Sequence, residues 1–346
     1  MQIIIPQMRI EAGAHCLFAS LRNLLAAGFG IRLSEADIYF RCDGMNVEYL
    51  PLSRPYWIGR SGDAMMRQFA ALGPVRTRYH FGVPEPAARL AVAEDIAREL
   101  AAGRLALLFA HSGCLTYHQV YRDNPSRPHV IGIYGIDLAR DTAYVIDSFL
   151  LDIGGTVHTY QGPAPLSSLL AGMYGLTYLE GPHAAGEWAD ADEPSVNEPT
   201  PIAYVRDGIG RFLGGSVGEW GNAQGLAAYR SFFERLTTVP ELDDATFTQT
   251  CKELYYCLRI GTVMHQWAYL QQIVRENTSA LRSSADAWLE TFAAEEQEWQ
   301  KHLLGFYKNG LRAYKANWGV ALERSHRLVD RQAAVLRQFA DDLIID

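Results

Sequence analysis

About halfway along its 346 residues, the chain changes character at an acidic, proline-rich stretch over residues 182–201. Before this stretch, amphipathic patterns alternate with short runs rich in β-branched residues, which is typical of mixed helices and strands. Beyond it, residues 212–344 are almost continuously compatible with helix. We therefore expect an exposed connector at 182–201 between an α+β domain over residues 1–181 and a helical domain over residues 202–346.

The first domain is expected to place most of its helices before its strands. Helices are expected from Cys16 onward and at 35–40, 63–72, 85–102 and 166–173. Strands are expected at 105–110, in a hairpin over 129–149 and near 156–160, with little strand signal further on. Helices followed by antiparallel strands indicate an α+β fold of the papain-like, cysteine-peptidase type.

Cys16 lies where a loop containing Gly13 runs into an amphipathic helix. A thiol at the N-terminus of a helix is close to the positive end of the helix dipole, which favours the thiolate, the form that attacks carbonyl groups. Cysteine is also among the most buried residue types, so this position indicates a nucleophile only if partners are present.

A nucleophilic thiol needs a base, and the base needs a third group that orients it. His129 opens an apolar strand, and Asp147 lies near the same end of the strand expected to return beside it. A four-residue turn would direct Asp147 away from His129. A five-residue turn over residues 137–141, or a bulge with the same effect, pairs Asp147 with Ile131 and puts it diagonal to His129 on one face. We therefore predict the longer turn or the bulge.

This pattern resembles a known family. Residues 13–16 read Gly-Ala-His-Cys and lead into Leu-Arg-Asn-Leu-Leu at 21–25 and Ser-Glu-Ala at 34–36. Together with the strand at His129 and Val-Ile-Asp at 145–147, they resemble the N-terminal domain of the butirosin biosynthesis protein H family. The order of Cys, His and Asp is more remotely similar to that of bacteriocin-processing and papain-like cysteine peptidases. The resemblance continues loosely into the helical half.

The resemblance implies an acyltransferase of antibiotic and other specialised-metabolite biosynthesis. Such an enzyme moves an acyl, aminoacyl or peptidyl group from a carrier-protein thioester through a cysteine to an amine. In this chain it implies that Cys16 is acylated, that His129 carries the proton and that Asp147 holds the imidazole tautomer. The implied partners are an acyl or peptidyl carrier protein and a small-molecule amine. No cofactor of its own is expected, since the phosphopantetheine arm arrives on the carrier.

The oxyanion hole departs from the papain-like pattern. Papain-like enzymes usually have a glutamine about six residues before the cysteine, and Ile10 stands at that position here. The backbone N–H of Cys16 is expected to supply one donor. Gln7 is our candidate for the second.

Candidate substrate contacts come from aromatic residues and a histidine. Tyr117 and His118 lie in the long loop before His129, and long loops beside a site often gate substrate. Tyr134 lies on the His129 strand, and Tyr229 is one of many aromatic residues in the helical half that can also form bundle core. No metal is expected, because the spacing of His111, Cys114 and His118 matches no compact zinc motif.

The composition excludes several classes. Five scattered cysteines without a CxxC pair, and the lack of a signal peptide, indicate a reducing cytoplasm rather than a disulfide framework. No apolar run approaches the roughly 20 residues of a membrane span, and a net charge of −8 argues against nucleic acid as a partner. Basic residues recur from Lys301 to Arg327, where an acidic carrier protein could dock.

Two alternatives stay open. A cysteine peptidase, amidase or thioesterase would use the same triad without an amine acceptor. A non-catalytic interaction protein would keep the triad only as a remnant.

Overall fold

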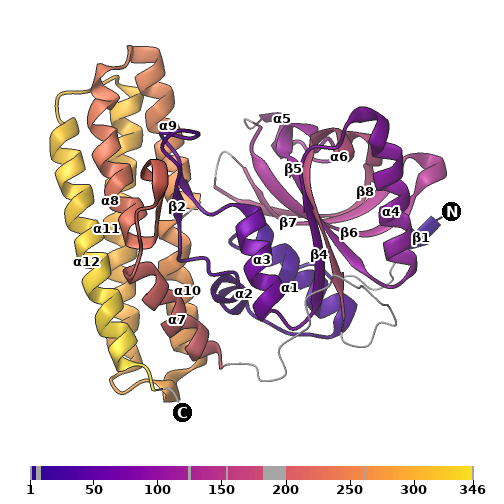
Figure 1. Cartoon of the computed structure of the whole chain (residues 1–346), viewed down its shortest axis with the longest axis horizontal. Helices are drawn as coiled ribbons and strands as arrows, with labels where there is room; N and C mark the ends of the chain where they lie inside the picture. The colour runs from indigo at the N-terminus through magenta and orange to yellow at the C-terminus, as the bar shows by residue number, and fades with distance from the viewer. Residues whose placement is uncertain are drawn as a thin grey trace. The chain divides into compact units, whose positions relative to one another are not determined.

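The computed structural model describes residues 2–4, 9–123, 126–152, 155–181, 200–260 and 262–344. The chain forms two compact units, which Figure 1 shows with the secondary-structure labels used below. Unit 1 comprises residues 1–38 and 62–198, and unit 2 comprises residues 39–61 and 199–346. Antiparallel sheet dominates the first half and helices the second, so the α+β class predicted from the sequence is confirmed.

The units do not divide the chain at the places expected from the sequence. Residues 39–61, expected in the first domain, belong to unit 2, since the strand Glu48–Tyr49 pairs with Ala223–Gln224 and Asp43 pairs with Arg211. The expected connector lies mostly outside the described residues. Its last two residues begin a helix, in which Thr200 is the N-cap and Pro201 the first residue.

Unit 1 is built on one antiparallel sheet. In the described part of the chain its strands are β1 (Gln2–Ile4), β4 (Arg76–Phe81), β5 (Leu105–His111), β6 (Pro128–Asp137), β7 (Thr142–Leu151), β8 (Val157–Pro165) and β9 (Met173–Glu180). Their spatial order is β4-β9-β5-β6-β7-β8, and β1 also pairs with β6. Strand β9 is the strongest departure from the sequence prediction, which expected little strand beyond residue 160.

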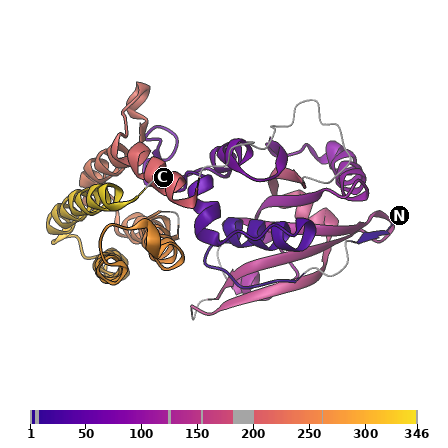
Figure 2. The ribbon, with the colours of Figure 1, turned by 90° about the horizontal axis from the view of Figure 1, so that it is seen from below.

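Unit 1 also contains helices. They are α1 (Cys16–Phe29), α2 (Glu35–Arg41, which unit 1 contains up to Ile38), α3 (Gly62–Leu72), α4 (Arg89–Ala101), α5 (Val120–Asp123) and α6 (Leu166–Gly172). Helix α1 lies along β6 and β7, as Figure 2 shows from a second direction. Gly132 permits this close approach, because a Cβ there would lie 2.7 Å from Ile146 Cγ1 and 3.0 Å from Leu24 Cδ2.

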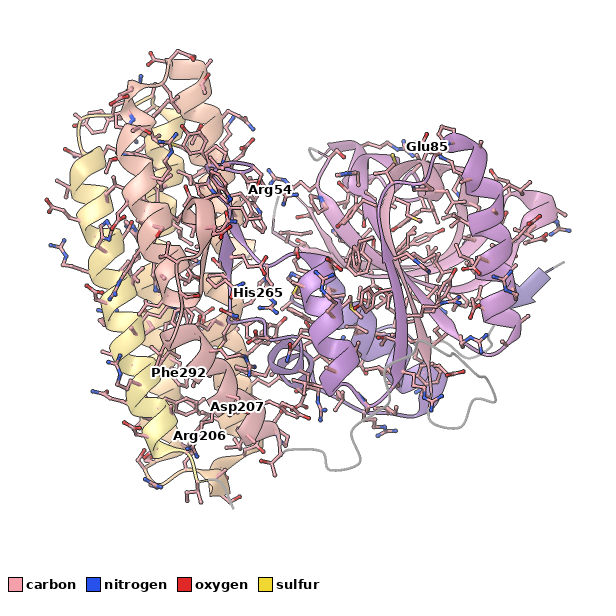
Figure 3. All side chains as sticks on the ribbon, viewed as in Figure 1. Arg54, Glu85, Arg206, Asp207, His265 and Phe292 are labelled. Carbon is pink, nitrogen blue, oxygen red and sulfur yellow. The ribbon has the colours of Figure 1, made fainter. Side chains whose placement is uncertain are left out.

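Unit 2 is mainly a bundle of helices. They are α7 (Pro201–Leu213), α8 (Gly225–Arg235), α9 (Asp244–Ile260), α10 (Val263–Glu276), α11 (Ala285–Leu311) and α12 (Trp318–Asp342). A small antiparallel sheet joins β10 (Ala223–Gln224), β2 (Glu48–Tyr49) and β3 (Ile58–Gly59). Many of the aromatic residues form the bundle core: Phe292, labelled in Figure 3, is completely buried against Trp267, Trp288 and Phe339.

Two further findings concern the chain as a whole. All five cysteines are free thiols. In the part of the chain that the structure describes, no helix is long and apolar enough to cross a membrane.

Candidate functional site

Cys16 is the first residue of α1 and is partly exposed. The residue before it, His15, is the N-cap, and its ring Nδ1 accepts a hydrogen bond of 3.2 Å from the Leu17 N–H. The His15 ring also stacks on Phe18, with ring centroids 4.4 Å apart. His15 therefore shapes the start of the helix, and the Cys16 N–H lies at the positive end of its dipole.

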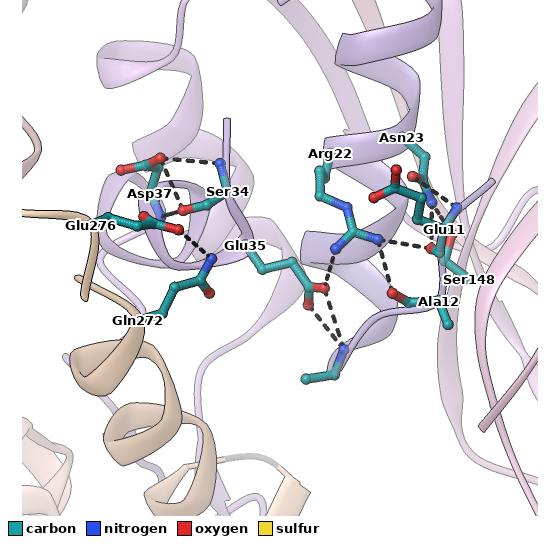
Figure 4. Close-up of polar contacts among 11 residues, drawn as sticks. Glu11, Ala12, Arg22, Asn23, Ser34, Glu35, Asp37, Ser148, Gln272 and Glu276 are labelled. Atoms are coloured by element: carbon teal, nitrogen blue, oxygen red, sulfur yellow. Dashed lines mark hydrogen bonds and ion pairs between the residues drawn. The ribbon is translucent and has the colours of Figure 1, made fainter. Parts of the chain in front are cut away.

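A side-chain network holds the loop that precedes Cys16 (Figure 4). Asn23 on α1 accepts from the Glu11 N–H at 3.2 Å and donates to the Glu11 carbonyl at 2.9 Å. The same amide donates to Ser148 Oγ on β7 at 2.8 Å, and the Gly13 N–H donates to the Ser148 carbonyl at 3.0 Å. The loop is thus tied both to its own helix and to the sheet.

An ion pair completes this attachment (Figure 4). Arg22 Nη2 donates to the Glu11 and Ala12 carbonyls, and Arg22 Nη1 lies 2.8 Å from Glu35 Oε1. The Glu35 carboxylate also accepts from the Ala14 N–H at 3.1 Å. Glu35 is in the first turn of α2, which Ser34 caps in the reciprocal arrangement with Asp37. We call Arg22, Asn23, Glu35 and Ser148 the loop clamp.

The hairpin that carries His129 and Asp147 combines a short turn with a bulge. Asp137 pairs with Thr142, so the turn has four residues rather than the five first considered. A bulge between Ile133 and Gly135 then shifts the register by one residue. Beyond it Gly132 pairs with Ile146, and continuing that register places Asp147 opposite Ile131. This bulge confirms the prediction of a longer turn or a bulge with the same effect.

His129 lies between Asp147 and Cys16. Its Nε2 is 3.0 Å from Asp147 Oδ1 and 3.1 Å from Oδ2. Cys16 is close enough to raise the pKa of the imidazole. Because Nε2 faces Asp147, Nδ1 is the ring nitrogen left for the thiol. Asp147 is completely buried, and His129 is 8% exposed. The structure therefore brings the three predicted side chains into one chain of contacts.

The charges of Cys16, His129 and Asp147 reinforce one another. Burial acts to lower the pKa of His129, but the charges of Asp147 and Cys16 outweigh it and raise the pKa from 6.5 to about 10. Burial acts to raise the pKa of Asp147, but the charge of His129 and side-chain hydrogen bonds lower it below its ordinary value. At neutral pH the pair is therefore an imidazolium against a carboxylate.

Two tyrosines also contact the buried carboxylate. The Tyr117 hydroxyl donates to Asp147 Oδ2 at 2.8 Å, and the Tyr121 hydroxyl donates to the same oxygen. The backbone N–H of Phe149 donates to Oδ1 at 3.2 Å. Asp147 thus receives hydrogen bonds from β6, from its own strand and from the segment that precedes β6.

The other predicted site residues have separate environments. Gln7, the expected second oxyanion donor, lies outside the described residues. His118 Nδ1 accepts from the Val120 N–H at 3.2 Å at the start of α5. Tyr134 is 8% exposed on β6, with its ring 6.3 Å from that of Tyr144. Tyr229 belongs to the core of unit 2, where it is 1% exposed and packs on Phe212 and Phe233.

Other parts of the described chain are weaker candidates for a functional site. No group of three or more His, Cys, Asp or Glu side chains there is arranged to hold a metal ion. A shallow hollow of about 420 Å³ in unit 2 is lined by residues of α7 and α12, including Arg206 and Asp207, which Figure 3 labels. In the basic run, Lys301 and Arg324 both pair with Glu298, so part of its charge is neutralised within the bundle.

Sequence reasoning did not assign roles to the loop clamp or to Tyr121. Arg22 and Asn23 lie beside the apolar stripe of α1, and Glu35 follows a capping serine, so each has an ordinary explanation within a helix. The available signal for Arg22, Asn23 and Glu35 was their place within the segments that carry the family resemblance, whereas Ser148 and Tyr121 lie outside these segments. Chemically, the arrangement offers a thiol at a helix N-terminus, a charged imidazole beside it and a buried carboxylate behind the imidazole.

The comparison with known families bears on this site. Residues 15–148 match the family described as Butirosin biosynthesis protein H, N-terminal. The matched segment runs from the N-cap of α1 into β7 and includes Cys16, His129 and Asp147. No curated protein matches the chain at a significant level. The resemblance indicated by the sequence is therefore confirmed over residues 15–148.

Proposed function

We propose, from the match of residues 15–148 to the butirosin biosynthesis protein H N-terminal family, that the protein is a cysteine-dependent acyltransferase. The proposed donor is an acyl, aminoacyl or peptidyl thioester on a carrier protein, and the proposed acceptor is a small-molecule amine. The family points to specialised-metabolite biosynthesis, including that of antibiotics. Cys16, His129 and Asp147 are the proposed catalytic residues.

The observation that carries this proposal is the placement of His129 between Cys16, which raises the imidazole pKa, and Asp147, whose Oδ1 is 3.0 Å from His129 Nε2. An imidazolium beside a thiol stabilises the thiolate, which is the nucleophilic form. The raised pKa of His129, due to Asp147 and Cys16 against the opposing effect of burial, supports an imidazolium in the resting enzyme. The loop clamp supports the reaction by holding the backbone that presents the thiolate.

In the first step the Cys16 thiolate attacks the carbonyl carbon of the donor thioester. The Cys16 N–H, at the N-terminus of α1, is the proposed donor to the oxyanion that develops. The carbon–sulfur bond to the carrier arm then breaks, and the leaving thiolate takes the proton of His129. The products are acyl-Cys16, a carrier thiol and a neutral imidazole.

In the second step the amine attacks the carbonyl carbon of acyl-Cys16. The neutral His129 accepts the proton that the amine loses as the carbon–nitrogen bond forms. The carbon–sulfur bond breaks, which releases the amide and restores the thiolate and the imidazolium. Asp147 stays ionised throughout and stabilises the imidazolium whenever it forms.

Intact-mass spectrometry after incubation with an acyl thioester tests the nucleophile. The wild-type protein is expected to gain the mass of one acyl group, and the Cys16→Ala variant none. Cys114→Ala, which removes another partly exposed thiol of unit 1, is the matched control and should still be acylated. An adduct that persists in Cys16→Ala would refute the assignment.

Product analysis then separates transfer from hydrolysis. With an added primary amine, the acylated protein is expected to release the amide faster than the free acid. Release of acid alone, at a rate that does not depend on the amine, would show a thioesterase instead. Failure of the wild-type protein to take up any acyl group would contradict the enzyme proposal.

A further inference from the structure

The Asp147 carboxylate is more extensively bound than orientation of a histidine requires. It is completely buried, and a buried carboxylate is costly unless hydrogen-bond donors surround it. Oδ2 accepts from the Tyr117 and Tyr121 hydroxyls, Oδ1 accepts from the Phe149 N–H, and His129 Nε2 is within 3.1 Å of both oxygens. These donors account for the roughly four acceptor sites of an ionised carboxylate.

The geometry points to Tyr117 and Tyr121 as positioning residues of this site, whose hydroxyls hold the ionised Asp147 carboxylate in the orientation in which it supports His129. This inference rests on the proposed function, since it assigns a role within the same triad. Neither hydroxyl takes part in the proposed mechanism, so both hydroxyls act through Asp147. The Tyr121 ring also packs edge-on against the His129 imidazole, with ring centroids 5.5 Å apart, and Tyr121→Phe keeps this contact.

The segment that carries the tyrosines is itself held firmly. At its base, the Ser112 N–H donates to the Arg127 carbonyl at 2.8 Å, and the Arg127 N–H donates to Ser112 Oγ at 2.9 Å. The Tyr117 ring stacks on Tyr160 of β8 with ring centroids 4.6 Å apart, and meets the Tyr121 ring edge-on at 5.6 Å. The hydroxyls therefore reach Asp147 from rings whose positions are fixed by packing.

Rotation of the carboxylate is opposed at both oxygens. The tyrosines engage Oδ2, and the Phe149 N–H engages Oδ1 from the same strand as Asp147. A turn of the carboxylate about its Cβ–Cγ bond would break hydrogen bonds at both ends. His129 thereby meets an acceptor of fixed orientation, which fixes the direction of its own ring.

Protonation states agree with this role. Burial first, and then the charge of Asp147, raise the pKa of Tyr117 and of Tyr121 well above 10, so both hydroxyls stay protonated and can donate at any working pH. Burial acts to raise the pKa of Asp147, but the charge of His129 and hydrogen bonds from His129, Tyr121 and Tyr117 lower it. Losing the tyrosine donors should therefore let Asp147 take up a proton at higher pH.

The surrounding titratable groups define what a pH measurement reports. Around Asp147 they are His129 on β6, Cys16 on α1, Tyr117 and Tyr121 on the preceding segment, and Tyr160, which pairs with Asp147 across β7 and β8. Tyr160 donates its hydroxyl to the Pro163 carbonyl at 2.7 Å. Tyr160→Phe therefore removes a hydroxyl from the same aromatic cluster without removing a donor to Asp147.

The test compares Tyr117→Phe, Tyr121→Phe and Tyr160→Phe, which all keep their rings. The readout is the rate of Cys16 alkylation by iodoacetamide across pH, followed by mass spectrometry, together with thermal unfolding. In the plot of alkylation rate against pH, the acid limb is the low-pH range in which the rate falls. Tyr117→Phe and Tyr121→Phe are each expected to move this acid limb to higher pH by about one unit. The reason is that a hydrogen bond to a charged group changes an equilibrium by about tenfold or more. Tyr160→Phe should leave the limb in place.

Kinetics of acyl transfer provide a second readout. In the same two variants kcat is expected to fall by about tenfold with little change in KM, because the lost hydrogen bonds act on the triad and not on substrate binding. Lower thermal stability with an unmoved acid limb in both variants would show that the tyrosines only anchor their segment, and would overturn the inference. Because alkylation needs no acyl donor, it decides this point even if the proposed acyl transfer is not observed.

Discussion

At the scale of single residues, His129 links the stability of unit 1 to pH. The charges of Asp147 and Cys16 outweigh burial and raise its pKa from 6.5 to about 10, so the folded chain binds this proton more tightly than the unfolded chain. The resulting stabilisation is complete below about pH 6.5 and is lost as the pH rises toward 10. Asp147, whose pKa is lowered despite burial, has the opposite dependence and loses its contribution as the pH falls below about 3.8.

Replacing Asp147 by asparagine should therefore weaken the pH dependence of stability in the alkaline range. The free energy of unfolding of the wild-type protein, measured in urea, is expected to fall between about pH 6.5 and 10. The fall should be smaller in Asp147→Asn, which lacks the charge that holds the His129 proton. Asp152→Asn is the control, because Asp152 contacts the more exposed His158 on the same sheet. Equal pH dependence in wild type and Asp147→Asn would contradict this account.

Gly132 sets the distance between α1 and the sheet. Gly132→Ala is expected to lower the free energy of unfolding by about 1–3 kcal/mol, because the added Cβ would press on Ile146 and Leu24. Gly305→Ala in α11 is the control, since its Cβ would have no atom within 4 Å and alanine favours helix by about 0.5–1 kcal/mol. Urea unfolding of both variants should show a lower free energy of unfolding for Gly132→Ala and a higher one for Gly305→Ala.

At the scale of elements, the nucleophile loop depends on side chains from α1, α2 and β7. Glu35, 5% exposed, accepts hydrogen bonds from both Arg22 and the Ala14 N–H. Glu35→Gln is therefore expected to cost about 2 kcal/mol in unfolding free energy and to slow alkylation of Cys16. Arg230→Met breaks an ion pair whose side chains are 53% and 65% exposed, and should cost less than about 1 kcal/mol with no effect on Cys16. Unchanged alkylation in Glu35→Gln would show that the loop does not need this clamp.

The hairpin shows what the sequence could predict at this scale. Side-chain alternation and the need for a shared face predicted the final register of Asp147 against Ile131. They could not decide between a longer turn and a bulge, because both give the same register further along the strands. The bulge at Ile133 and Gly135 is decided by local backbone geometry that the hydrophobic pattern does not encode.

The strands missed by sequence reasoning have identifiable causes. Strand β9 follows α6 directly, since Gly172 ends the helix and Met173 begins the strand, so no turn residues mark the boundary. In strand β4, arginines take alternate positions at its start, so the apolar pattern of a strand is missing there. One of them, Arg78, pairs with Glu99 of α4 at 2.8 Å. Likewise, Tyr121 and the loop clamp act through contacts distant in sequence, which spacing alone cannot reveal.

At the scale of the whole molecule, the second unit incorporates a segment from the first half of the chain. Asp43, which is 3% exposed and has a φ of 51°, lies 3.0 Å from both Arg60 and Arg211. The Cys257 thiol of α9 also binds this segment, since it accepts a hydrogen bond from the Ile58 N–H and donates one to the Ile58 carbonyl. The family match over residues 15–148 therefore includes part of both units.

Asp43→Asn tests this organisation. Asparagine tolerates a positive φ but removes the charge that two arginines face, so a loss of about 2 kcal/mol is expected in unit 2. Hydrogen–deuterium exchange should accelerate in α7 and β2, while the amides of β5 keep their protection. Equal acceleration in β5 would show that residues 39–61 stabilise both units alike.

The position of β9 between β4 and β5 has a consequence for how the protein is made. Translation at roughly 5–20 residues per second needs several seconds to pass from the end of β5 to residue 180. Throughout that interval the nascent chain carries β4 and one edge of β5 without the strand that finally joins them, and open strand edges invite pairing with other chains. Newly made protein should therefore be most prone to aggregation until the ribosome has released residues 173–180.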